Sequence, residues 1–132
     1  ATVRSQGAAA MQALADSAPG RGFTPGVTQT HPDIVQRAQA WIAGIAPEGY
    51  AACCEALATS DLRESIGRIA VPTLLLAGAD DPVTTVADAQ AMQASIAGSS
   101  LAVVPASHLS NLEAPQAFEQ AVLDFLAHAA KA

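Results

Sequence analysis

Apolar residues in the first half of the chain recur at the spacing of helix faces. The pattern predicts helices over residues 2–15, 33–43 and 47–57. Pro-Gly pairs at residues 19–20 and 25–26 predict loops between them, because both residue types interrupt regular structure. We therefore expect the first sixty residues to be helical, without a strand.

The second half alternates short apolar runs with helical patterns. Continuous apolar runs over residues 71–78 and 100–105 have the length of strands that are buried on both faces, as in parallel sheets. A helical pattern follows each run, over residues 84–96 and from Pro115 onward. The order strand–helix–strand–helix predicts an α/β fold with a parallel crossover. One face of the last helix gathers its apolar residues, Phe118, Val122, Phe125 and Leu126.

Two parallel strands are too few to form a stable sheet by themselves. Their unpaired edge is expected to bind another strand. That strand would come from residues outside this chain or from a second copy of it. The sequence thus predicts an incomplete sheet and a chain that needs a partner.

Composition narrows the classes of function. Hydrophobic residues make up 51% of the 132 residues, which excludes a disordered chain. The net charge of −6 disfavours nucleic-acid binding, because such a surface repels phosphates. No stretch has the roughly 20 apolar residues of a membrane-spanning helix. The two cysteines, Cys53 and Cys54, are adjacent and cannot join distant segments, so we expect a cytoplasmic protein, with both thiols buried in a helix.

Ionisable residues follow both predicted strands. Asp80 and Asp81 come after the first strand, and His108 comes after the second. In open α/β sheets functional residues collect beyond the carboxyl ends of the strands, so these side chains are expected at one rim. An aspartate paired with a histidine can orient the imidazole as a general base for a serine nucleophile. Asp81 and His108 are our candidate catalytic residues.

Other interpretations of these residues stay open at this point. Adjacent aspartates after a strand often accept hydrogen bonds from loop amides and do no chemistry. A metal site at Asp80, Asp81 and His108 lacks a further ligand with convincing spacing, so no metal is predicted. Trp41 lies on an apolar helix stripe and is either a core residue or part of a substrate-binding pocket.

The residues around both candidates resemble a known family. The segments 71–84 and 106–115 are similar to the C-terminal part of α/β-hydrolases, in which the triad acid follows a glycine as Asp81 follows Gly78. The triad histidine of that family precedes a Glu-x-Pro, as His108 does here. Within the family, the segment 47–63 and the sequence His-Leu-Ser-Asn after the second strand look most like 3-oxoadipate enol-lactonases.

The resemblance implies a fold and an activity. Residues 1–60 would form a helical cap, and residues 61–132 would supply the last two parallel strands of the hydrolase core with their helices. The implied activity is cofactor-free hydrolysis of an enol-lactone in aromatic degradation, with Asp81 and His108 in the triad. The family's nucleophile lies in Gly-x-Ser-x-Gly, and the sequence contains no such pentapeptide.

Three hypotheses follow for the chain. It is a C-terminal fragment of an enol-lactone hydrolase, inactive alone and completed by an N-terminal part that carries the serine. Alternatively it belongs to another esterase of the same fold, with a different small-molecule ester as substrate. In the third hypothesis it is a non-catalytic fragment that associates with itself through the open strand edge.

Overall fold

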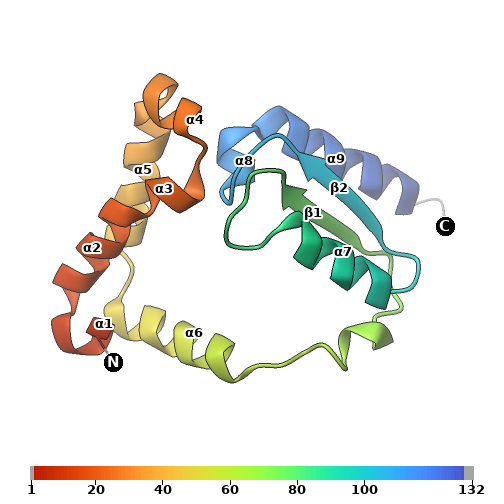
Figure 1. Ribbon diagram of the computed structural model, residues 1–132, viewed down its shortest axis with the longest axis horizontal. Coiled ribbons are helices and arrows are strands. Elements are labelled where there is room, and N and C mark those ends of the chain that lie inside the picture. Colours follow the sequence, from red (N-terminus) through yellow and green to blue (C-terminus); the bar gives the residue numbers. More distant parts are fainter. Residues whose placement is uncertain (1, 130–132) are drawn as a thin grey trace. The chain divides into compact units, whose positions relative to one another are not determined.

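The computed structural model describes residues 2–129, which divide into two compact units (Figure 1). Residues 2–20 and 25–61 form the first unit. Residues 62–129 form the second, and the short segment 21–24 belongs to this second unit. We call this segment the strap. The chain thus enters the second unit briefly before it completes the first.

The first unit is helical, as predicted. Its main core forms where α2 packs against α5, around the buried residues Met11, Ala15 and Ala38. Its helices are α1 (Thr2–Gln6), α2 (Ala8–Ser17), α4 (Pro25–Thr30), α5 (Pro32–Ala43) and α6 (Pro47–Thr59), and α3 (Pro19–Gly22) runs into the strap.

Two details of the first unit differ from the sequence prediction. The single helix expected over residues 2–15 is split at Gly7, which has a φ of 54°, a left-handed conformation that favours glycine. The loops expected at Pro19 and Pro25 are the starts of short helices. Proline fits the first position of a helix because its missing N–H would have no partner there.

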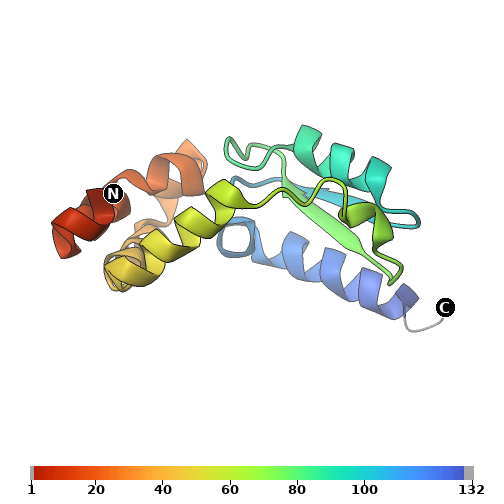
Figure 2. The same ribbon diagram turned by 90° about the horizontal axis from the view of Figure 1, so that it is seen from below.

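The second unit contains the predicted order of strand, helix, strand and helix. Strands β1 (Leu74–Gly78) and β2 (Ser100–Val104) pair in parallel, from Leu74 opposite Ser100 to Gly78 opposite Val104. Helices α7 (Val86–Ser95) and α9 (Pro115–Ala129) cover opposite faces of the sheet (Figures 1 and 2). A 3₁₀ turn (η1, Ile66–Arg68) precedes β1, and the short helix α8 (Ser110–Glu113) lies between β2 and α9.

Helix α7 begins at a capping box directly after the β1 loop. The Thr85 hydroxyl accepts the Asp88 N–H at 3.2 Å, and the Asp88 carboxylate accepts the Thr85 N–H at 2.8 Å. The two residues thereby satisfy each other's unpaired backbone donors. This cap fixes the end of the loop that carries Asp81.

The sheet is less covered than the apolar runs predicted. Val103 in β2 is 48% exposed, and α9 contains no fully buried residue although Leu126 belongs to its apolar face. Within residues 2–129, β1 pairs with β2 alone and its other edge has no strand. The prediction that both strands are buried on both faces was therefore wrong for this chain. The reason is that a two-stranded sheet leaves part of β2 and of α9 without a neighbour.

Two further observations concern α6 and the helices in general. Cys53 and Cys54 are free thiols and exposed on α6, which corrects the expectation that the helix buries them. The reason is that Ala51 is the only buried residue of α6, so both thiols lie on the part of the helix surface that nothing in the described chain buries. None of the helices in the described part of the chain is both long and apolar enough to cross a membrane.

Candidate active site

The loops after the two strands are joined by backbone hydrogen bonds. The Ala79 N–H donates to the Val104 carbonyl at 2.9 Å, and the Asp80 N–H donates to the Ala106 carbonyl at 3.0 Å. Pairing therefore continues past the strands and carries the two loops side by side. At the same point Gly78 lies against the carbonyl groups that follow β2, where there is no room for a side chain.

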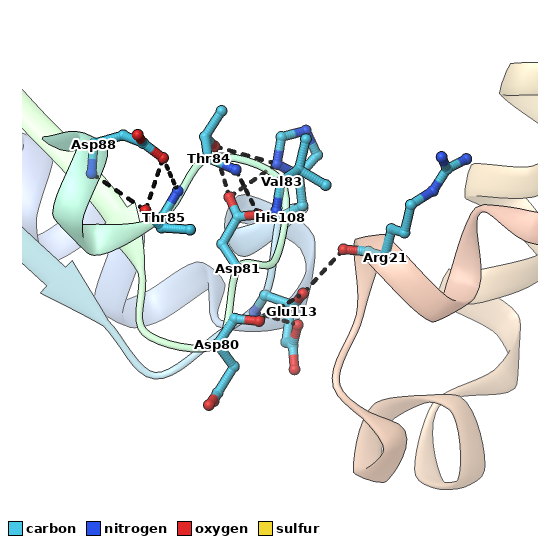
Figure 3. A network of polar contacts seen from close by, with 10 residues as sticks. Arg21, Asp80, Asp81, Val83, Thr84, Thr85, Asp88, His108 and Glu113 are labelled. Carbon is cyan, nitrogen blue, oxygen red and sulfur yellow. Dashed lines mark hydrogen bonds and ion pairs between the residues drawn. The ribbon is translucent and has the colours of Figure 1, made fainter.

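The Asp81 carboxylate is the centre of the first loop (Figure 3). Its Oδ1 accepts the N–H groups of Val83 at 2.7 Å and Thr84 at 3.1 Å. Its Oδ2 accepts the Thr84 hydroxyl at 2.7 Å. Such an aspartate turn orders the loop and fixes the carboxylate. The side chain of Asp81 is only 5% exposed.

His108 lies against the second oxygen of this carboxylate. Its Nδ1 is 2.9 Å from Asp81 Oδ2, and its side chain is 39% exposed. Burial raises the pKa of Asp81, but hydrogen bonds from His108, Thr84 and Val83 outweigh it and lower that pKa from 3.8 to about 2. Asp81 is thus ionised near neutral pH and can only accept, so the Nδ1 of His108 must carry the proton. The other ring nitrogen is left unprotonated in neutral His108, as a general base requires.

The remaining candidates lie outside this pair. The side chain of Asp80 is exposed, while its backbone joins the two loops. Trp41 lies on α5 and is 56% exposed, with the Arg37 guanidinium 5.4 Å from its ring centroid. It is therefore not a core residue, and its place in a substrate pocket stays a prediction. No group of three or more metal-ligating side chains occurs within residues 2–129.

Known proteins resemble this chain in sequence and in fold. 3-Oxoadipate enol-lactonase 2 of Acinetobacter baylyi is 49% identical over 120 residues, which are 91% of this chain and 44% of that protein. 3-Oxoadipate enol-lactonase 1 of the same organism is 39% identical over 106 residues, which are 80% of this chain and 40% of the relative. The crystal structure of the enol-lactonase from Burkholderia xenovorans LB400 superposes with a TM-score of 0.89 and 35% identity, over 95% of this chain and 47% of that one. No protein-family model matches the chain.

The chain belongs to the α/β-hydrolases. It spans less than half the length of the curated relatives that it matches. The resemblance that the two motifs predict is thereby confirmed at the level of the family. Both of these curated relatives are 3-oxoadipate enol-lactonases.

In this α/β-hydrolase chain, sequence reasoning missed two polar residues of the site. Thr84 donates to Asp81 and lies 3.4 Å from the Nδ1 of His108, through a hydroxyl that serves the same carboxylate oxygen. The Glu-x-Pro motif contains Glu113 but does not predict that its carboxylate accepts the backbone N–H of Ser107, next to His108. The Asp-x-x-Thr spacing was a usable signal for Thr84, since side chains three residues apart meet in such turns.

The depressed pKa of Asp81 predicts how the hydrolase chain responds to acid. Because the folded pKa lies below the ordinary value, ionised Asp81 stabilises the fold above about pH 4, and this stabilisation is lost as the pH falls toward 2. The difference corresponds to about 2 kcal/mol of unfolding free energy. Urea unfolding of Asp81→Asn between pH 5 and pH 2 should lack this loss. The matched Asp80→Asn variant, altered at an exposed carboxylate, should keep it; equal acid profiles for the wild type and Asp81→Asn would contradict the prediction.

Proposed function

We propose that this chain supplies the acid and the base of a serine hydrolase that opens the enol-lactone of 3-oxoadipate. The observation that carries the proposal is the contact between His108 Nδ1 and the buried carboxylate of Asp81 at 2.9 Å. The choice of substrate rests on the two enol-lactonase relatives. The adjacent free thiols of Cys53 and Cys54 support a reducing, cytoplasmic compartment as part of the same proposal.

In the proposed mechanism the imidazole moves the protons. The Nε2 of His108 removes the proton from a serine hydroxyl as its oxygen attacks the lactone carbonyl. The ring oxygen leaves as an enol that takes the proton back from His108, and the acyl group stays on the serine. His108 then deprotonates a water that attacks the acyl-enzyme, which releases the acid and restores the serine. Asp81 stabilises the protonated imidazole in both steps and holds its orientation.

The serine in this proposal comes from residues outside these 132. No Gly-x-Ser-x-Gly occurs in the sequence, and the chain matches 44% of its relative in Acinetobacter baylyi. The free edge of β1 and the exposed apolar residues of α9, Leu123 and Leu126, support an N-terminal hydrolase part as the partner. Added strands at that edge would cover this surface.

A complementation experiment tests the proposal. The chain alone is compared with a fusion protein. In the fusion, the N-terminal part of 3-oxoadipate enol-lactonase 2 of Acinetobacter baylyi, up to the segment that matches this chain, is joined in front of Thr2. Hydrolysis of the enol-lactone is measured by the release of acid. For the chain alone its rate should equal that of the uncatalysed reaction in buffer, and for the fusion it should be well above that rate. Turnover by the chain alone would contradict the proposal, and so would an inactive fusion that circular dichroism shows to be folded.

Three further measurements make the outcome specific. A fluorophosphonate probe, which labels activated serines, should label the fusion and not the isolated chain. Light scattering of the isolated chain tests the partner assignment: a stable dimer would point to a second copy at the free strand edge, and a monomer is expected if an N-terminal hydrolase part is the partner. The fusion carrying Asp81→Asn should retain its fold and lose about 10⁴-fold in rate.

A further inference from the structure

The backbone on both sides of His108 is hydrogen-bonded to the strap. The Leu109 N–H donates to the Gly22 carbonyl at 2.9 Å. The hydroxyl of Ser107 donates to the Arg21 carbonyl at 3.0 Å (Figure 3). The histidine therefore sits between two residues that are each held by a segment more than eighty positions away in the sequence.

One carboxylate completes this attachment. The Glu113 Oε2 accepts the Ser107 N–H at 2.9 Å, and its two oxygens accept the Thr24 N–H at 3.2 and 3.3 Å. The Thr24 hydroxyl also donates to Glu113 Oε1. Glu113 thus bridges the end of the strap and the residue directly before His108.

The environment of the imidazole makes this bridge consequential. The side chain of His108 is 39% exposed, and within residues 2–129 the polar contacts of its ring are those of Nδ1 with Asp81 and Thr84. Ser107, by contrast, is only 3% exposed. The position of the ring is therefore set by the loop backbone as well as by its own contacts.

We propose that Glu113 is a positioning residue, which acts through Ser107 and the strap to hold His108 against Asp81. The catalytic meaning of this role rests on the proposed function, but the positioning itself does not. Removal of the carboxylate leaves the Ser107 N–H without its partner in a buried place, which is costly unless the loop moves. A displacement of about 1 Å at a catalytic group can cost about 10²-fold in rate.

Nuclear magnetic resonance of the isolated chain tests the positioning without any substrate. In the wild type, nitrogen-15 spectra of His108 at alkaline pH should show the Nδ1–H tautomer. In Glu113→Ala the fraction of this tautomer should fall by at least half, while the amide signals of β1 and β2 stay in place. The matched control is Glu119→Ala, the same change at an exposed residue of α9, which should leave the His108 signals unchanged.

Milder variants keep the test decisive if Glu113→Ala fails to fold. Thr24→Val removes one hydroxyl from the bridge, and Glu113→Gln keeps one acceptor oxygen. Each should shift the His108 tautomer in the same direction by a smaller amount. A folded Glu113 variant with wild-type His108 signals overturns the proposal, even if its melting temperature is lower, because a merely structural role would give that result.

The fusion enzyme provides the second readout. Glu113→Ala should lower kcat about 10²-fold with little change in KM, since the substrate contacts are not altered. If the wild-type fusion has no activity, the proposed function fails, while the resonance experiment still decides the role of Glu113. An unchanged kcat in the variant of an active fusion would overturn the positioning role.

Discussion

Replacement of His108 by glutamine should reduce the kcat of the completed hydrolase on the order of 10⁶-fold, the size of effect seen when a triad base is removed. Glutamine is close in size but cannot take the proton from a serine hydroxyl. The Asp81 carboxylate would stay in its loop, since Val83 and Thr84 hold it independently of the ring. Steady-state hydrolysis of the enol-lactone by the fusion enzyme measures the loss.

The matched control for this experiment is His128→Gln. His128 is exposed on α9 and its Nδ1 contacts a backbone carbonyl of its own helix, that of Asp124. The control variant should keep the wild-type rate. A His108→Gln enzyme with more than a tenth of that rate would remove His108 from the mechanism.

The second large effect is expected at Gly78, where an alanine should destabilise the second unit by about 3 kcal/mol. A Cβ at this position would come 2.5 Å from the carbonyl oxygens of both Ala106 and Ser107. Because these are backbone atoms, the strand ends would have to separate. Urea unfolding followed by circular dichroism measures the loss, and the His108 resonances should change together with it.

Gly49→Ala is the matched control for Gly78→Ala. A Cβ on Gly49, in α6, would meet nothing within 4 Å. The same substitution in a helix commonly stabilises by about 0.5–1 kcal/mol, because alanine loses less freedom on folding. A Gly78→Ala chain as stable as the Gly49→Ala chain would show that the two loops are not tightly packed.

The sequence predicted the parts of the site that depend on local patterns. The apolar run that ends in Gly78 and the position of His108 after the second run were enough to place Asp81 and His108 at one rim. Their contact distance could not be predicted, because it depends on the backbone pairing beyond the strands. The extent of burial was also overestimated, since periodicity shows which residues are apolar and not what covers them.

The strap and Glu113 show why the rest could not be predicted. The Pro-Gly pairs around the strap indicate a break in structure but give no partner for it. The hydrogen bonds of Glu113 to Thr24 join positions 89 apart, and no spacing rule relates such residues. A single sequence contains the donors and acceptors of this bridge but not their pairing.

The path of the strap has a consequence for dissecting this protein. The boundary predicted from the sequence lies between residues 60 and 61, yet a recombinant piece that begins at Asp61 would lack the four residues that hold the backbone around the histidine. Such a piece would retain the paired strands, but the backbone on both sides of His108 would lose its hydrogen bonds to the strap. Any engineered split or exchange of halves in this scaffold must therefore carry residues 21–24 along with the downstream half.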